Sequence, residues 1–189
     1  MNLVKNRPVL RLVLCGVCLA LYFILSIVSI NTQVIKITID ALPVIFIAIV
    51  CGPIDGLAVG LLGSFFAQLY LYGLTVTTPL WILPAGIRGL IVGLMFYHKD
   101  VRVHKIRWIL TVIISGLIVT GINTGVIILD AKIFKYPTQI TYISTFMRVL
   151  TNIVTSLIYI YLVPLLTNAL VKAGLLKPVE ENAKEKVGA

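Results

Sequence analysis

The stretch PLWILPAGIRGLIVGLMF, from Pro79 to Phe96, decides the fold of this chain. It is about long enough to cross a bilayer, because a transmembrane helix needs about 20 mostly apolar residues. Arg88 stands in its middle, where insertion scales put the cost of a charged side chain at about 2.5–3.5 kcal/mol. Arg148 repeats the pattern in the apolar run that begins near Tyr142. Charged residues so placed face a bundle interior or a watery cavity, so we expect the chain to hold something polar inside the membrane.

The composition is that of a polytopic membrane protein. Of 189 residues, 59% are hydrophobic and 12% charged, with a mean hydropathy of +1.06, whereas soluble domains carry about 25% charged residues. We therefore expect an all-α fold, a compact bundle of six transmembrane helices, near 8–30, 41–52, 54–72, 79–97, 107–129 and 139–172. The run 41–52 is short, and is tilted, interfacial or buried among its neighbours. Residues 1–176 form the helical domain, and 177–189 form a charged tail that is predicted to be disordered.

The basic residues predict the orientation of the chain. Eleven of them fall on one side of the predicted spans: Lys5, Arg7, Arg11, Lys99, Arg102, Lys105, Arg107, Lys172, Lys177, Lys184 and Lys186. The other side has Lys36, Lys132 and Lys135, and its loops include 31–40 and roughly 130–138. Both termini are therefore predicted to be cytoplasmic. Basic residues beside membrane spans are retained on the cytoplasmic side and attract anionic lipid, which accounts for the net charge of +9. Nucleic acid is therefore not an expected partner.

Polar residues gather in the outer half of the predicted bundle, where they could line a pocket open to the exterior. The six candidates for binding a substrate are Gln68, Trp81, Arg88, Asn123, Arg148 and Asn152. Arginine offers a fixed fork of donors to carboxylates or heteroaromatic acceptors, and tryptophan offers a plane for stacking. The two asparagines could instead bond neighbouring helices. No intramembrane acid pairs the arginines, because all seven acids fall at helix ends, in loops or in the tail.

No catalytic residues, metal site or cofactor are predicted. Cys15, Cys18 and Cys51 have no second pair or histidine beside them, so they are expected to be small packing residues. The chain has no Walker loop and no nucleophile elbow, and its spans lack the Asp, Glu or His that ion-coupled carriers use. It is therefore predicted to bind a solute without powering its transport, and not to be an enzyme.

Small residues recur four apart, a spacing that lets helix backbones approach closely in lipid. Three sets are expected to pack inside the bundle: Gly56, Gly60 and Ser64; Ala85, Gly89 and Gly93; Gly121 and Gly125. Gly16 and Ala20 make one such step on an otherwise bulky first helix, which could dock a separate membrane partner. Asp55 is expected to favour the positive dipole end of the third helix.

Several motifs resemble those of the S-components, the substrate-binding subunits of energy-coupling-factor vitamin transporters. The resemblance covers nearly the whole chain. Its motifs are ITIDALP (37–43), CGP (51–53), GLAVG (56–60) and LPAGIRGLIVG (83–93). The folate branch is the most similar, through Ile122-Asn123-Thr124 and Phe146-Met147-Arg148. Folate is therefore the leading ligand. Because Ser64 stands where the folate pattern often has an acid, the other candidates stay open: a pyrimidine or thiamine precursor, pantothenate, riboflavin and a queuosine precursor.

The resemblance implies a high-affinity, six-helix vitamin-binding subunit of an ATP-driven importer in a bacterial plasma membrane. It also implies three protein partners: a transmembrane coupling subunit and two cytoplasmic ATPases. Gly16 and Ala20 match the small pair that packs against the coupling subunit. The alternative is a small membrane scaffold protein of the rod-shape morphogenesis type with no transport role. The buried arginines favour the importer subunit, because a scaffold has no need for unpaired charge within its spans.

Overall fold

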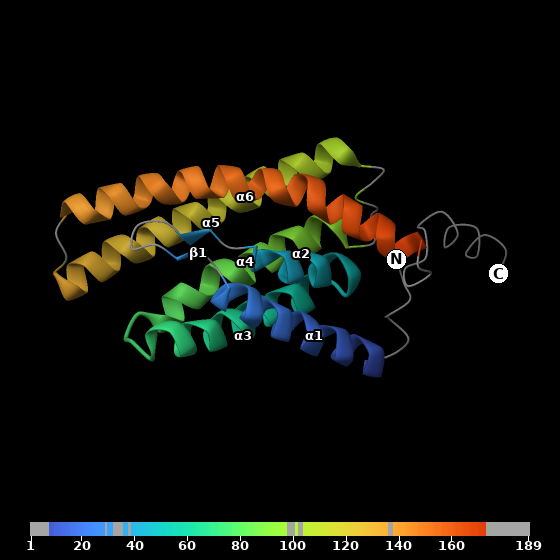
Figure 1. Cartoon of the computed structure of the whole chain (residues 1–189), viewed down its shortest axis with the longest axis horizontal. Coiled ribbons are helices and arrows are strands. Elements are labelled where there is room, and N and C mark those ends of the chain that lie inside the picture. The colour runs from blue at the N-terminus through green and yellow to red at the C-terminus, as the bar shows by residue number, and fades with distance from the viewer. Residues whose placement is uncertain are drawn as a thin grey trace.

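The computed structural model describes residues 8–28, 30–31, 36–37, 39–97, 101, 104–135 and 138–172. Within these ranges the chain forms six helices and one minimal antiparallel strand pair (Figure 1). The helices are α1 (Pro8–Ile27), α2 (Ala41–Val50), α3 (Pro53–Tyr72), α4 (Thr78–Phe96), α5 (Lys105–Phe134) and α6 (Thr138–Lys172). The strands β1 (Ile30–Asn31) and β2 (Lys36–Ile37) pair Ile30 with Ile37. The predicted all-α fold is confirmed, and the predicted tail 177–189 lies outside the described residues.

Five of the helices, α1, α3, α4, α5 and α6, are long and apolar enough to cross a membrane. The remaining helix, α2, has 10 residues, so its rise of about 15 Å is half of a hydrocarbon core of about 30 Å. Eight of its residues are buried, which shows why the run is apolar without periodicity: neighbours cover it on all sides. Of the alternatives for this segment, burial among its neighbours is the one that the structure supports.

Turn chemistry sets the helix boundaries. The α2 helix ends at Val50 because Gly52 adopts a positive φ of 124° and Pro53 starts α3. At the other end of the bundle, α5 continues to Phe134 and ends where Lys135 takes the left-handed conformation, with φ 56°. The prediction that this helix stops near residue 129 was therefore wrong. An apolar run ending in a charged residue looked like a helix end, but the backbone continues for another turn.

The α4 helix occupies the centre of the fold, in contact with α2, α3 and α5. Its close approach to α3 depends on glycine. A Cβ on Gly60 would lie 2.5 Å from the carbonyl oxygen of Ala85, and one on Gly93 would collide with Pro53. The predicted internal packing is confirmed for the two sets of small residues that contain Gly60 and Gly93. It was wrong for Gly121 and Gly125, where an added Cβ would meet no atom within 4 Å, because α5 presents a different face to its neighbours.

The buried core forms two clusters around α2. In one, the ring of Trp108, 2% exposed, packs edge-on against Phe96 with centroids 5.4 Å apart. The other joins α1, α2 and α3, and contains Cys18 and Cys51. Both of these cysteines are buried and all three are free. The expected role of Cys18 and Cys51 as packing residues is confirmed.

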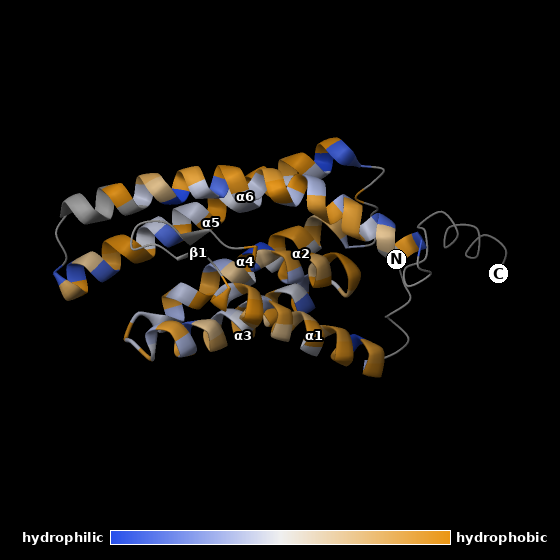
Figure 2. Cartoon of the chain, in the orientation of Figure 1, coloured by the Kyte–Doolittle hydropathy of each residue, from blue (hydrophilic) through white to orange (hydrophobic). Residues whose placement is uncertain are grey.

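We call the end at which α1 begins and α6 ends the proximal end, and the opposite end, where α4 begins and α5 ends, the distal end (Figure 1). The predicted orientation makes the proximal end cytoplasmic. The α5–α6 hairpin lies to one side of α1, α3 and α4. Hydrophobic residues run along most of the helical surface, and hydrophilic ones mark both ends of α5 (Figure 2).

Candidate functional site

Three side chains from three helices meet towards the distal end. Trp81 lies in the first turn of α4, Asp130 one turn before the end of α5, and Arg148 about three turns into α6. The indole Nε1 of Trp81 donates a hydrogen bond of 2.8 Å to Oδ2 of Asp130. The guanidinium carbon of Arg148 lies 5.0 Å from the centroid of the Trp81 ring, within the range of a cation–π contact. We call these three residues the distal cluster.

Asp130 is the member that sequence reasoning missed, because the sequence predicts a loop from about residue 130. Its Oδ1 is buried and has no hydrogen-bond partner among the residues that the structure describes. The spacing of Asp130 from another candidate residue could have identified it. Asn123, already a candidate, lies seven residues earlier, and residues seven apart on a continuous helix share a face. Because α5 continues for another turn, Asp130 lies on the helix and its carboxylate is placed near Trp81 and Arg148.

A second polar group lies deeper in the bundle, around Arg88. Arg88 is two turns from Trp81 along α4, which corresponds to about 10.5 Å of rise. Its guanidinium carbon is 5.7 Å from the ring centroid of Tyr159, a side chain of α6 that is 3% exposed. The Nε of Arg88 is buried, and no group in the described part of the chain accepts a hydrogen bond from it. An ionised donor is thus left with unused hydrogen-bonding capacity inside an apolar bundle.

The other three candidates do not join these groups directly. Asn152 packs against α5, where a Cβ on Gly116 would come within 2.9 Å of its Nδ2. This contact fits the alternative in which Asn152 joins neighbouring helices. Gln68 and Asn123 are half-buried on α3 and α5. Within the described residues, neither one is hydrogen-bonded to Trp81 or to an arginine.

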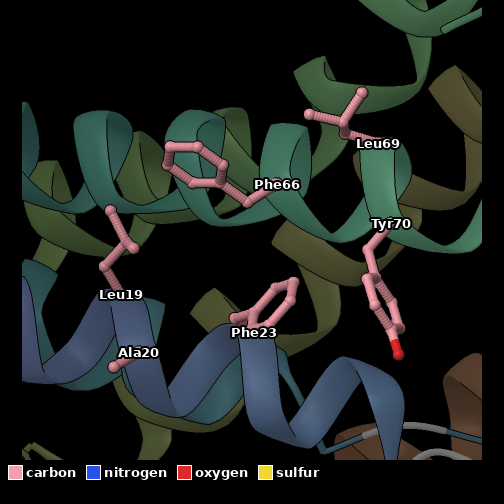
Figure 3. A pocket seen from close by; sticks show the side chains of 6 residues that line it. All are labelled: Leu19, Ala20, Phe23, Phe66, Leu69 and Tyr70. Carbon is pink, nitrogen blue, oxygen red and sulfur yellow. The ribbon is translucent and has the colours of Figure 1, made fainter. Parts of the chain in front are cut away.

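The predicted docking residues lie on the outside of α1. Gly16 and Ala20 are both exposed, and a Cβ added to Gly16 would meet no atom within 4 Å. Beside them an open apolar groove of about 660 Å³ runs between α1 and α3 (Figure 3). Its lining residues are Leu19, Ala20 and Phe23 from α1, and Phe66, Leu69 and Tyr70 from α3. The small pair therefore does not contribute to internal packing.

An ion pair ties the proximal ends of α1 and α3 together. The Nε of Arg11 donates to Oδ2 of Asp55 over 2.6 Å, and the side chains are 43% and 14% exposed respectively. Asp55 does lie in the first turn of α3 as expected, but it has this second role across two helices. No group of three or more His, Cys, Asp or Glu side chains that could hold a metal ion occurs among the described residues.

Comparison with known proteins gives a family for these features. Residues 10–179 match the family described as ECF transporter, substrate-specific component. The chain belongs to this family. It is also 28% identical over 174 residues to a UPF0397 protein of Phytoplasma australiense, an alignment that spans 87% of this chain and 88% of that protein.

Family membership makes the chain an S-component, a substrate-binding subunit of an energy-coupling-factor importer and a multi-pass membrane protein. It is thus assigned to a class of transporter subunits and not to the scaffold or enzyme classes. The comparison identifies the family and no branch within it, so it gives no support to the folate branch in particular. In this S-component the fold brings Trp81 and Arg148 together, and adds Asp130 and Tyr159 to the predicted polar residues.

Proposed function

We propose that this S-component captures a vitamin-sized, partly polar molecule among α4, α5 and α6 with high affinity, on the outer side of a bacterial plasma membrane. Arg88 and Arg148 bind its acceptor groups, and Trp81 stacks on its ring. Asn123, Asn152 and Gln68 contact its polar edge. Folate is the leading ligand, and a pyrimidine or thiamine precursor, pantothenate, riboflavin and a queuosine precursor are the alternatives.

The observation that carries this proposal is the buried Nε of Arg88, which lacks a hydrogen-bond partner in the described chain. A charged group in a membrane interior is costly, and leaving one of its donors unpaired adds about 1–3 kcal/mol or more. A ligand acceptor would satisfy that donor. Because the Arg88 donor is already desolvated and oriented in the free protein, ligand binding does not incur that free-energy cost again.

Transport itself is proposed to depend on partners. The exposed face of α1 around Gly16 and Ala20 docks the transmembrane coupling subunit, and two cytoplasmic ATPases supply the energy. The open space at Gly16 supports this role, since a glycine required for internal packing would have atoms close to its missing side chain.

The test is direct identification of the ligand followed by substitution of Arg88. The protein is purified in detergent, and co-purified small molecules are identified by mass spectrometry. We expect Arg88→Ala to weaken binding of that molecule about tenfold or more, since a hydrogen bond to a charged group contributes about 1.5–3 kcal/mol. Arg107→Ala is the matched control, because Arg107 is exposed in the first turn of α5 at the proximal end. Equal affinity in folded Arg88→Ala and Arg148→Ala proteins would remove both arginines from the site.

A further inference from the structure

The carboxylate of Asp130 has one oxygen engaged and one unused. Oδ2 accepts the 2.8 Å hydrogen bond from Trp81, whereas Oδ1 is buried and has no partner in the described residues. A buried acceptor without a donor is unfavourable, and more so when it is charged. Such atoms are rare in native proteins, and a bound group that completes the hydrogen bonding is one explanation for them.

The surroundings of this oxygen restrict what can complete it. The guanidinium carbon of Arg148 lies 5.0 Å from the centroid of the Trp81 ring, and no ion pair joins Arg148 to Asp130 in the described chain. The N–H of Trp81 lies in the plane of its indole, so the carboxylate that accepts from it lies at the edge of the ring. A planar molecule stacked on the indole would therefore present its edge, and not its face, to the carboxylate of Asp130.

The distal cluster and Arg88 are complementary in their unused groups. Among the residues that the structure describes, the buried Nε of Arg88 has no acceptor and the buried Oδ1 of Asp130 has no donor. Trp81, which is hydrogen-bonded to Asp130, is separated from Arg88 by a rise of about 10.5 Å along α4. A single molecule of vitamin size could reach both levels, with its acceptor towards Arg88 and its donor towards Asp130.

We infer that Asp130 is a specificity-determining residue of this site, and that the ligand is a nitrogen heterocycle whose ring-edge N–H donates to Oδ1 of Asp130. The inference rests on the proposed function and narrows its list of ligands. Folates, flavins and deazaguanine-type queuosine precursors carry a ring N–H at this edge, and aminopyrimidines carry an exocyclic amino N–H there. Pantothenate, which has no heterocycle, does not.

The experiment measures binding of five probes to the purified full-length protein: folate, riboflavin, an aminopyrimidine, 7-cyano-7-deazaguanine and pantothenate. We expect one of the four heterocycles to bind. Asp130→Asn should then weaken its binding about tenfold or more, because the amide oxygen can keep the Trp81 contact only by turning its NH₂ group towards the ligand N–H. Asp55→Asn is the matched control, since it makes the same change at the opposite end of the bundle and should leave the affinity unchanged.

A second measurement begins with the wild-type protein, so its first result does not depend on the folding of the variant. The bound heterocycle is compared with its analogue methylated at the donor nitrogen, such as N3-methylriboflavin for riboflavin. Wild-type protein should discriminate against the methylated probe by about tenfold or more, and Asp130→Asn should lose most of that discrimination.

The outcomes separate the two proposals. A heterocycle that binds equally well to wild type and to folded Asp130→Asn would overturn the role of Asp130 while leaving the proposed function in place. Binding of pantothenate alone would do the same. If no probe binds and no small molecule co-purifies, both proposals fail. Loss of affinity in Asp130→Asn together with loss of discrimination against the methylated probe would support the inference.

Discussion

Replacement of Gly16 by leucine tests whether α1 docks a partner subunit, and Gly60 offers an internal comparison. Both are glycines of 20-residue helices long enough to span a membrane. They differ in what a side chain would meet. At Gly16 a Cβ meets nothing within 4 Å, whereas at Gly60 it lies 2.5 Å from the carbonyl oxygen and 2.7 Å from the carbonyl carbon of Ala85.

These surroundings predict opposite effects on the isolated protein. Alanine or leucine at Gly16 should leave the free energy of unfolding within about 0.5 kcal/mol, or raise it slightly, because glycine inside a helix is about 0.5–1 kcal/mol worse than alanine. Alanine at Gly60 should destabilise by about 1–3 kcal/mol, since its obstacle is backbone and the helices α3 and α4 must move apart. Thermal unfolding in detergent measures both effects.

Assembly should show the reverse order. If a helix of the coupling subunit contacts the α1 backbone at Gly16 and Ala20, leucine at either position overpacks that contact by about 1–3 kcal/mol, or about 5- to 150-fold in the dissociation constant. We expect Gly16→Leu and Ala20→Leu to bind ligand normally. They should lose co-purification with the coupling subunit and ATPases, and lose ATP-dependent uptake in proteoliposomes.

Two results would refute this reasoning. A Gly16→Leu protein that unfolds or loses ligand binding when isolated would show that this face is needed inside the bundle. A protein with leucine at both Gly16 and Ala20 that keeps full ATP-dependent uptake would show that the docking surface lies elsewhere.

Two further predictions concern energy supply and the proximal ion pair. Reconstituted alone, the protein should bind its ligand but not concentrate it under a proton or sodium gradient, and gradient-driven accumulation measured with radiolabelled ligand would contradict the subunit role. Arg11→Ala should lower the melting temperature more than Asp55→Asn, because it leaves the less exposed carboxylate charged and unpaired, at a cost of about 1–3 kcal/mol. An unchanged melting temperature in Arg11→Ala would show that the ion pair does not hold α1 to α3.

Much of the fold follows from the sequence alone, because lipid imposes a strong and simple constraint. A backbone without water must satisfy its hydrogen bonds within each segment, so an apolar run of about 20 residues has to form a helix. The five long helices obey this rule, and Gly52-Pro53 separates α2 from α3 where expected. Small residues four apart on α3 and α4 also predicted close packing, which the short distances at Gly60 bear out.

Helical periodicity identifies residues that share a face but does not say which neighbour that face meets. Gly121 and Gly125 have the same spacing as the packing glycines and nevertheless face open space. The rotation of α5 about its axis decides this, and that rotation depends on contacts with α4 and α6 along its whole length. For the same reason the sequence could not show Asn152 lying against Gly116.

The sequence by itself determined that two arginines lie within apolar segments, and that lipid would force them towards the interior of a bundle. Only the tertiary structure decided their partners: the Trp81 ring for Arg148 and the Tyr159 ring for Arg88. It also placed Asp130 beside Trp81. These contacts join residues 49 or more positions apart, and their geometry depends on how three helices pack, which no local pattern of residues encodes.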